Sequence, residues 1–375
     1  VNYGRANTQY QPAVAGQTRA PAAQRTHAWR TEPVASGLGK GWAIEPLPDG
    51  RWLVTEKRGA LRIVAADGTV GAAITTGLPA VDARGQGGLL DVALAPDFRT
   101  SRRIYWSYSE PREGGNGTAV ASGVLGENAV TDVRVIWRMQ PTLDSTMHFG
   151  SRLVFARDGT LFVTTGERSI LPGRAQAQDL NSHFGKIVRI NADGTVPRDN
   201  PFANRSGVRP DIYASGVRNV QSAALHPRTG ELWEVEHGPA GGDELNRILP
   251  GRDYGWPTIS YGNEYAGGPI GEGRTAAPNM EQPVYYWDPV IAPSGMEFYT
   301  GDRFPAWRDS VFVGDMKTLG LVRLVLTGNR VVAEERLQLG SRIRDVKQGN
   351  DGALYVLTEV RGDGPSTIVR LVPAT

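Results

Sequence analysis

From about residue 27 to its end, the chain alternates short hydrophobic runs with polar turns. The runs are rich in Val, Leu, Ile, Trp and Tyr, and the segments between them are rich in Gly, Pro, Asp and Asn. Long patterns with the period of an amphipathic helix are hard to find. This alternation predicts an all-β fold made of short strands and tight turns.

One hairpin pattern occurs six times in this part of the chain. The copies begin at Leu47, Ala95, Ala156, His226, Trp307 and Gly349, so their starts are 42 to 81 residues apart. Propeller blades recur at about 40–50 residues, with insertions in loops on one face. The pattern therefore predicts a six-bladed β-propeller of four-stranded antiparallel sheets. Residues 28–36 are expected to complete the last blade beside residues 367–371, and a pair of β-sandwiches is the alternative.

The same alternation sets the domain boundaries. Residues 1–26 are rich in Ala, Gln, Thr and Pro and lack periodicity, which predicts a loosely ordered arm on the surface. Residues 27–375 are expected to form a single propeller domain. The two longest intervals between hairpins lie between residues 156 and 307. We therefore expect this side of the propeller to carry the long functional loops.

Composition and charge exclude several classes of function. A formal net charge of +2 gives no strong indication of nucleic-acid binding, and the absence of cysteine excludes disulfide and thiolate chemistry. No segment approaches the length of a membrane span. No signal-peptide pattern opens the chain, so we expect an exported protein, periplasmic or secreted, whose leader has been removed. The lack of cysteine fits a cytosolic protein as well.

Residues 147–168 form a hairpin pattern with reactive side chains at both ends. Two hydrophobic runs flank Asp158-Gly159, a strong turn signal because both residues tolerate positive φ. His148 lies just before the hairpin and Glu167-Arg168 just after it. Since a hairpin returns on itself, both clusters should emerge at the same end of a small sheet. The alternative is an edge hairpin with a solvent-facing histidine.

Two segments carry side chains suited to an anionic or quinone ligand. Gln86 lies in a glycine-rich loop, where the backbone can approach a ligand closely. Arg218 and Asn219 stand together at a predicted strand end, and a guanidinium beside an amide suits carboxylates or quinone oxygens. A simple turn and a structural salt bridge are the respective alternatives.

Arg342 and Arg344 give a more specific indication of an anionic ligand. They lie two residues apart, so on a strand both face the same side. Two like charges facing one way are unfavourable unless an anion or an acid lies between them. Trp287 and Lys317 are the other candidates in the last third of the chain. Pairing of the arginines with surface carboxylates is the alternative.

Residues 236–257 have the composition of a calcium-binding region. Calcium takes roughly six to eight oxygen ligands, many of them backbone carbonyls on irregular loops. Gly238-Pro239 provides irregular backbone, and Asp243 and Glu244 provide carboxylates. His237 is a candidate ligand for another metal, but no second histidine lies at ligand spacing.

Seven motifs follow one another in the order and spacing of a known family. They are Gln-Gly-Gly-Leu-Leu-Asp at 86–91, His148 with Ser151-Arg152-Leu153, Gly-Lys-Ile-Val-Arg-Ile-Asn at 185–191, Gly-Val-Arg-Asn at 216–219, Glu-His-Gly-Pro at 236–239, Asp-Tyr-Gly-Trp-Pro at 253–257, and Arg-Ile-Arg-Asp at 342–345. From about residue 33 to residue 372 the chain resembles the soluble pyrroloquinoline quinone (PQQ)-dependent sugar dehydrogenases, in particular the bacterial aldose sugar dehydrogenase branch.

This resemblance implies a six-bladed propeller with PQQ at the mouth of its central channel. The implied activity is oxidation of aldose sugars at C1 to lactones, with His148 as general base, hydride passed to PQQ, and Arg218 beside the quinone. The implied cofactor-binding residues are Gln86, His148, Glu167 (often Asp in the family), Arg218, Asn219, Lys317, Arg342 and Arg344. Gln86 and Trp287 match positions beside the substrate.

The resemblance also implies two calcium ions and an external partner. Gly238 and Pro239 match the carbonyls that hold the calcium bound to PQQ, and Glu244 and Tyr254 look like ligands of a second, structural calcium. Electrons are expected to pass to an external acceptor: a quinone, a cytochrome or a dye. The chain lacks the longer insertions of the glucose dehydrogenase branch, which implies an open site, broad sugar specificity and a monomer.

Two other classes stay open. A calcium-dependent propeller hydrolase of the sugar lactonase type would need a carboxylate-rich metal centre, and it would not need Arg342 beside Arg344. A propeller that only binds sugar or protein would need no general base. No G-x-G-x-x-G follows a strand and opens a helix, which weighs against NAD.

Overall fold

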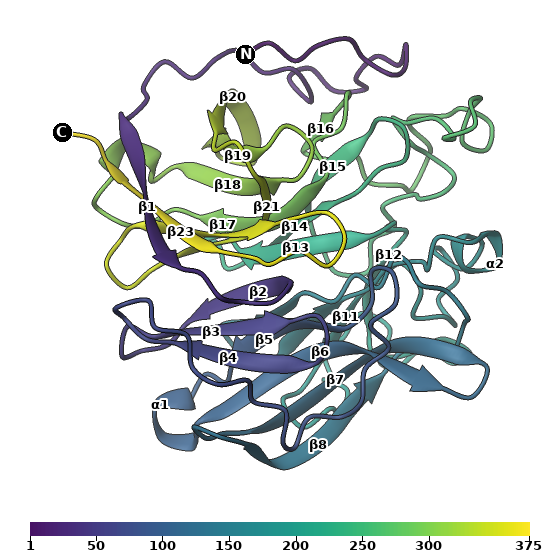
Figure 1. Cartoon of the computed structure of the whole chain (residues 1–375). Helices are drawn as coiled ribbons and strands as arrows, with labels where there is room; N and C mark the ends of the chain where they lie inside the picture. The colour runs from purple at the N-terminus through teal and green to yellow at the C-terminus, as the bar shows by residue number, and fades with distance from the viewer.

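The computed structural model describes residues 1–375 and contains 23 β-strands in six antiparallel sheets, arranged as the blades of a propeller (Figure 1). The first sheet holds β2 (Gly41–Pro46), β3 (Trp52–Glu56) and β4 (Ala60–Val64). The second holds β5 (Leu89–Leu94), β6 (Arg103–Arg112), β7 (Gly115–Leu125) and β8 (Val130–Arg138). The third holds β9 (Leu153–Phe155), β10 (Leu161–Thr164), β11 (Lys186–Ile190) and β12 (Ile212–Ser215).

The remaining three blades follow in chain order. The fourth sheet holds β13 (Val220–Leu225), β14 (Leu232–Glu236), β15 (Asp243–Arg247) and β16 (Tyr285–Trp287), and the fifth holds β17 (Pro293–Phe298), β18 (Ser310–Asp315), β19 (Gly320–Thr327) and β20 (Arg330–Gln338). The sixth holds β21 (Arg342–Gln348), β22 (Leu354–Glu359), β23 (Ile368–Pro373) and β1 (Trp29–Ala35). Helix is confined to α1 (Phe98–Ser101), α2 (Leu171–Arg174) and the 3-10 turn Pro305–Trp307. No helix is long and apolar enough to cross a membrane.

The prediction of a six-bladed propeller is confirmed. Each of the six hairpins found in the sequence joins the first two strands of one sheet. The first sheet has three strands, and its outer edge is continued by isolated pairs between Val64 and Val70 and between Leu61 and Ile74. Glycines at 68, 71 and 77 interrupt this segment, which explains why a full fourth strand does not form.

The ring closes through the N-terminal strand, as the sequence predicts. β1 pairs antiparallel with β23, so the sixth sheet contains both ends of the domain (Figure 1). Six hydrophobic clusters lie between neighbouring blades, including one between the sixth sheet and the first. The core is therefore a closed ring of interfaces, which leaves the central channel for polar residues.

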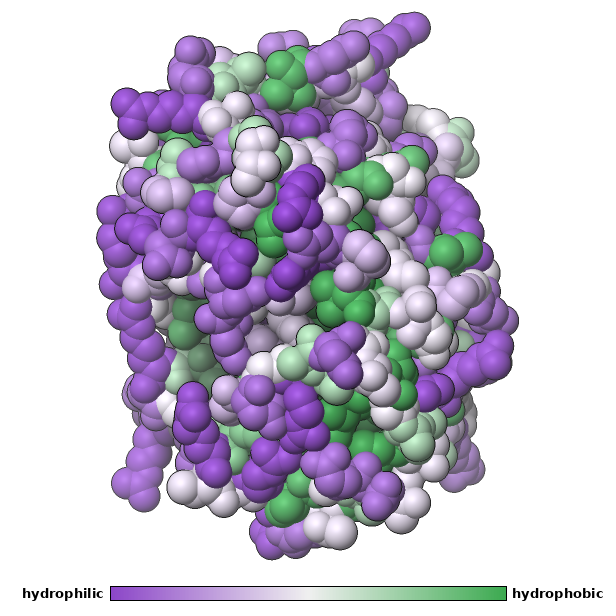
Figure 2. All heavy atoms as spheres, turned by 60° about the vertical axis from the view of Figure 1, so that its left-hand side comes forward, coloured by the Kyte–Doolittle hydropathy of each residue, from purple (hydrophilic) through white to green (hydrophobic).

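Residues 1–26 contain no helix or strand and run over the fourth and fifth blades (Figure 1). Hydrogen bonds that involve side chains attach them there. Gln17 is buried and donates to Gln282 and to the carbonyl of Pro283. Thr8 donates to Asp288. Figure 2 shows a largely hydrophilic face on which hydrophobic side chains form small separate groups, as expected when the apolar side chains lie between the blades.

Candidate active site

The hairpin of β9 and β10 brings His148 and Glu167 together, as predicted. Nδ1 of His148 is hydrogen-bonded to Oε1 of Glu167, and both side chains are almost fully buried. His148 has φ of 54° and Arg168 has φ of 70°, so two non-glycine residues at the pair adopt the left-handed conformation. Such backbone is uncommon and tends to occur where a side chain is held in a functional position.

Two glycines allow the backbones of these segments to touch. A Cβ on Gly166 would lie 2.1 Å from the carbonyl oxygen of His148, and a Cβ on Gly150 would lie 2.4 Å from the carbonyl carbon of Thr165. Neither distance is sterically allowed for another residue. Glycine at both positions is therefore what lets the imidazole meet the carboxylate.

Glu167 accepts hydrogen bonds from three directions. The Ser169 amide donates to Oε1 at 2.7 Å, and the indole Nε1 of Trp256 donates to Oε2 at 3.1 Å. Burial by itself would raise the pKa of Glu167, but the hydrogen bonds and the cation of Arg218 hold it below its usual value. Burial lowers the pKa of His148, against the opposing effect of Glu167. At neutral pH the pair is an ionised carboxylate beside a neutral imidazole, which leaves Nε2 unprotonated.

Arg218 lies next to this pair in a buried position. Its Nη1 donates to the carbonyls of His237 and Gly238 at 2.9 and 2.8 Å. Its guanidinium lies 5.3 Å from the ring of Trp256, which also binds Glu167. Arg218 has no carboxylate within salt-bridge distance, so its role differs from that of the structural ion pair considered from the sequence.

A cavity of about 290 Å³ opens beside these residues. Four predicted residues line it together: Gln86, Asn219, Arg342 and Arg344. The carbonyl oxygen of the Gln86 side chain accepts from the His148 amide at 2.9 Å, which connects the cavity to the His148–Glu167 pair. Arg342 and Arg344, both on β21, line the same cavity, as expected from the sequence, although the register of the strand shifts at Arg344.

Lys40 and Lys57 also line the cavity, and sequence reasoning missed them. The chain has five lysines against 36 arginines, so each lysine could have been considered as a candidate site residue. Burial, together with the neighbouring cations of Lys40 and Arg344, lowers the pKa of Lys57 to about 8. The cavity therefore gathers four basic side chains and a single carboxylate, Glu359.

The basic side chains of this cavity are not fully paired. Glu359 binds Arg342 at 2.8 Å and lies 4.0 Å from Arg344. The Nε atoms of Arg218, Arg342 and Arg344 are buried without any hydrogen-bond partner. Burial lowers the pKa of Arg344 to about 10. Unsatisfied buried donors are costly, and a bound anion would satisfy them.

Two predicted residues lie outside this group. Lys317 is exposed, and its side chain makes no hydrogen bond or ion pair. Trp287 is buried in the hydrophobic cluster between the fourth and fifth blades, where it packs edge-on against Tyr285. Its position on β16, opposite Asp243, turns the ring toward the next blade and away from the cavity.

The residues expected to bind calcium form two groups. Gly238, with its neighbour Pro239, lies in the loop where Arg218 contacts the backbone. Glu244 lies on β15 beside Glu234, Glu236 and Asn246, and the Asn246 amide donates to all three carboxylates. Burial raises the pKa of Glu244, and repulsion from Glu236 adds to it. The hydroxyl of Tyr254 is bonded to the backbone of Arg247 and Leu249.

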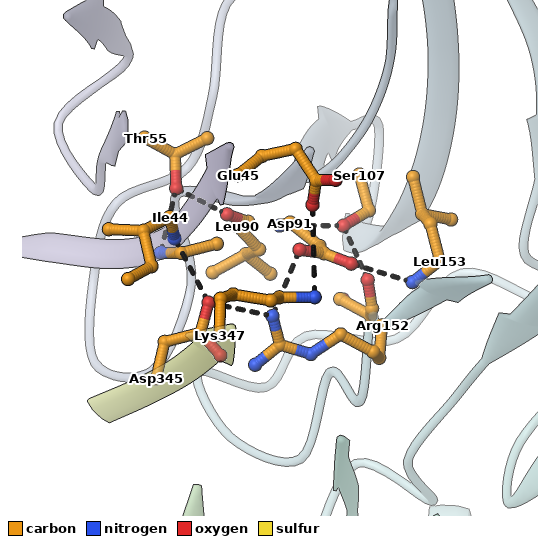
Figure 3. Close-up of polar contacts among 12 residues, drawn as sticks. Ile44, Glu45, Thr55, Leu90, Asp91, Ser107, Arg152, Leu153, Asp345 and Lys347 are labelled. Atoms are coloured by element: carbon orange, nitrogen blue, oxygen red, sulfur yellow. Dashed lines mark hydrogen bonds and ion pairs between the residues drawn. The ribbon is translucent and has the colours of Figure 1, made fainter. Parts of the chain in front are cut away.

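Below the cavity, the channel is filled by a network centred on Arg152 (Figure 3). Arg152 binds Asp91 at 2.9 Å and Asp345 at 3.3 Å, and it donates to the carbonyls of Gln221 and Ser294. Its guanidinium lies 4.5 Å from the ring of Trp42. These five partners and Arg152 itself come from six different blades. Farther along the channel, Lys347 lies 3.7 Å from Glu45.

Comparison with known proteins identifies related chains of similar length. A family model described as glucose/sorbosone dehydrogenase matches residues 38–370. The aldose sugar dehydrogenase YliI of Escherichia coli is 44% identical over 335 residues, which cover 88% of this chain and 89% of that protein.

Solved structures show the same similarity. The apo form of the soluble aldose sugar dehydrogenase from Escherichia coli is 42% identical, with a TM-score of 0.87 over 92% of this chain and 100% of that chain. The PQQ-bound form of an aldose sugar dehydrogenase from Streptomyces coelicolor is 26% identical, with a TM-score of 0.73 over 94% of this chain and 100% of that chain.

Proposed function

The chain belongs to the glucose/sorbosone dehydrogenase family, and on this premise we propose that it oxidises aldose sugars at C1 to lactones with PQQ and calcium as cofactors. The observation that carries the proposal is the excess of unpaired positive charge in the cavity. Lys40, Lys57, Arg342 and Arg344 face a single carboxylate there. PQQ carries three carboxylates, so it supplies the negative charge that this cavity lacks.

The residues present suit this cofactor in their chemistry. The unpartnered Nε atoms of Arg342 and Arg344 are donors available to cofactor carboxylates. Gln86 and Asn219 offer amide groups on the cavity wall. Lys317, although exposed, is close enough in sequence to Met316, which lines the cavity, to be kept as a further cofactor contact.

His148 performs the proton transfer in this proposal. Its Nδ1–H is directed at Glu167, so Nε2 can take the proton of the anomeric hydroxyl while hydride leaves C1. Bound PQQ supplies the quinone that receives the hydride, and calcium supplies Lewis acidity at its carbonyl. Arg218, held against the His237–Gly238 backbone, places a positive charge where negative charge develops.

The proposal includes two calcium ions. The carbonyl of Gly238 already accepts a cationic donor, Arg218, and with Pro239 it would hold the calcium bound to PQQ. Glu244 belongs to a buried group of three carboxylates with no cation, and Glu234 Oε2 has no partner there. A structural calcium beside Glu244 and Tyr254 would neutralise this group. Because the Tyr254 hydroxyl is already bonded, this residue would contribute its backbone carbonyl.

The remaining parts of the proposal concern partners and location. Electrons pass to an external quinone, cytochrome or dye. The protein is a monomer, and it works in the periplasm or outside the cell. A sugar lactonase would need a carboxylate-rich metal centre in the cavity, whereas Glu359 is the single carboxylate there and is bound to Arg342.

A reconstitution assay tests the proposed function. Apoprotein should gain sugar:dye oxidoreductase activity only when PQQ and calcium are both added. His148→Gln should lower turnover by about 10²–10⁴, the usual contribution of a positioned general base, and should leave PQQ binding nearly unchanged. His27→Gln, which removes an imidazole far from the cavity, is the control. Full activity after exhaustive chelation, or with NAD alone, contradicts the proposal.

A further inference from the structure

Tyr265 is the most exposed large hydrophobic side chain of the protein, with 75% of its surface in solvent. It nevertheless lies against a buried residue of the site. Nη2 of Arg218 donates to the Tyr265 hydroxyl at 3.4 Å, and the guanidinium lies 5.9 Å from the centre of the ring. The ring therefore has one side near a catalytic cation and a large area facing solvent.

The loop that carries Tyr265 is anchored on both sides of the ring. The amide of Gly267 donates to the carbonyl of Glu264, which forms a tight turn with Tyr265 just after its first residue. Asn263 pairs with Ala240, one residue beyond the Gly238–Pro239 loop. These contacts set the position of the turn and leave the ring itself uncovered.

A second contact ties the turn to the opposite wall of the site. The carboxylate of Glu264 forms an ion pair with Arg174 of α2, and Arg174 lies 5.2 Å from the ring of Trp256. Trp256 donates to Glu167, the partner of His148. The turn is thus connected to the catalytic pair through a short series of packed side chains.

We propose that Tyr265 is the platform on which the aldose ring rests while its anomeric hydroxyl faces His148, an inference that rests on the proposed function and deepens it. A pyranose presents C–H groups on its face and hydroxyls around its edge. A tyrosine ring offers a matching flat apolar surface with a polar tip. Trp287, the aromatic residue that the sequence suggested for this role, is buried between blades. Tyr265 is the aromatic side chain in contact with Arg218 that stays accessible.

Steady-state kinetics of three variants tests the proposal. Tyr265→Ala should raise KM for aldoses by roughly fivefold to tenfold, the scale of one lost aromatic contact. Its kcat and its affinity for PQQ should change little, because His148 and the lining of the cavity are unaltered and Arg218 keeps its bonds to the His237 and Gly238 carbonyls. Tyr265→Phe keeps the platform and should stay within about twofold of wild type. Leu171→Ala is the matched control, since Leu171 is 71% exposed on the neighbouring α2 and contacts no catalytic side chain.

A second readout separates this inference from the proposed function. Saturation-transfer NMR with glucose or xylose should show transfer to the sugar ring protons from wild type and from Tyr265→Phe, and a marked loss in Tyr265→Ala. This experiment needs no turnover. If the protein does not bind PQQ but saturation transfer to the sugar still depends on Tyr265, the proposed function is wrong and the role of Tyr265 as a sugar platform stands. Unchanged KM and unchanged transfer in Tyr265→Ala, or a changed KM for the acceptor dye alone, would overturn the platform.

Discussion

Arg152 and the pair formed by Arg342 and Arg344 lie in the same channel of this propeller and differ in how their charge is satisfied. At the channel floor, Arg152 binds the carboxylates of Asp91 and Asp345 (Figure 3). Its other two guanidinium nitrogens donate to backbone carbonyls, so each nitrogen has a partner. At the mouth, Arg342 and Arg344 share one carboxylate and keep a buried Nε–H without a partner. Arg152 and Arg344 are both buried, whereas 20% of the Arg342 side chain is exposed, and the local balance of charge is opposite at the two places.

The difference teaches how to tell a structural arginine from a binding one. A buried charge is stable when it is paired and fully hydrogen-bonded, so the folded chain already satisfies Arg152. Arg344 is only partly satisfied: its Nη2 donates to the Gln221 side chain, its nearest carboxylate lies 4.0 Å away, and its Nε–H has no partner, so a bound anion would complete its hydrogen bonds. Its pKa, which burial lowers to about 10, reflects this lack of compensation. The following predictions test the contrast, beginning with the largest effect.

Replacing Arg152, whose guanidinium is fully hydrogen-bonded, should destabilise the folded protein. Arg152→Met leaves Asp91 and Asp345 buried without their cation, and breaking a buried pair in this way costs about 3–5 kcal/mol of unfolding free energy. Urea unfolding of the variant should show this loss, or no folded protein should be recovered. Arg134→Met, which removes an exposed arginine of β8, is the control and should change stability by less than about 0.5 kcal/mol. If Arg152→Met loses no more unfolding free energy than Arg134→Met, the network around Arg152 does not stabilise the fold.

Glu234, Glu236 and Glu244 form an acidic group without a cation, just as the arginines at the channel mouth lack an anion. If calcium binds there in the native state alone, a hundredfold excess over Kd should raise stability by about 2.7 kcal/mol. The melting temperature should then rise with free calcium, and Glu244→Gln should reduce the rise. Glu127→Gln, on an exposed loop, should respond as wild type does. A melting temperature that changes with neither calcium nor chelator would contradict this assignment.

The smallest effect concerns the pH dependence of His148. Because the base must be unprotonated, turnover is present above the pKa of His148 and is lost as the pH falls through it. Burial lowers this pKa, so turnover should persist below the ordinary histidine range. Glu167 opposes that shift, so Glu167→Gln should move the acidic limb lower by about one pH unit. It should also lower the plateau, because the tautomer loses its carboxylate partner. An acidic limb in the same place in both proteins would mean that another group is titrating.

The sequence predicts well what depends on local pattern. The six hairpins follow from turn residues and strand alternation, and His148 meets Glu167 because one short hairpin joins them. Arg342 and Arg344 line the same cavity because both belong to one strand, β21. In each case the decisive geometry lies within a few residues of the chain.

Features that depend on distant segments were harder to predict. Lys40 and Lys57 reach the cavity from the first blade, and Trp256 reaches Glu167 across 89 residues of sequence. Trp287 shows the opposite case, because the register of β16 against β15 turns its ring into the interface between blades. Ion pairs also join residues far apart in the sequence. The sequence therefore could not show that the guanidinium of Arg152 is fully hydrogen-bonded and that of Arg344 is not.

A PQQ titration of wild-type apoprotein and of Arg344→Met, with stability measured on the same samples, decides whether the arginines at the channel mouth bind the cofactor. Wild type should bind PQQ saturably, and Arg344→Met should bind it more weakly by about 1.5–3 kcal/mol, the range for a charge-assisted hydrogen bond. The unfolding free energy of the two apoproteins should agree within about 0.5 kcal/mol, since the folded chain does not depend on this charge. Equal PQQ affinity in the two proteins, or a loss of stability in Arg344→Met like that of Arg152→Met, would contradict this binding role.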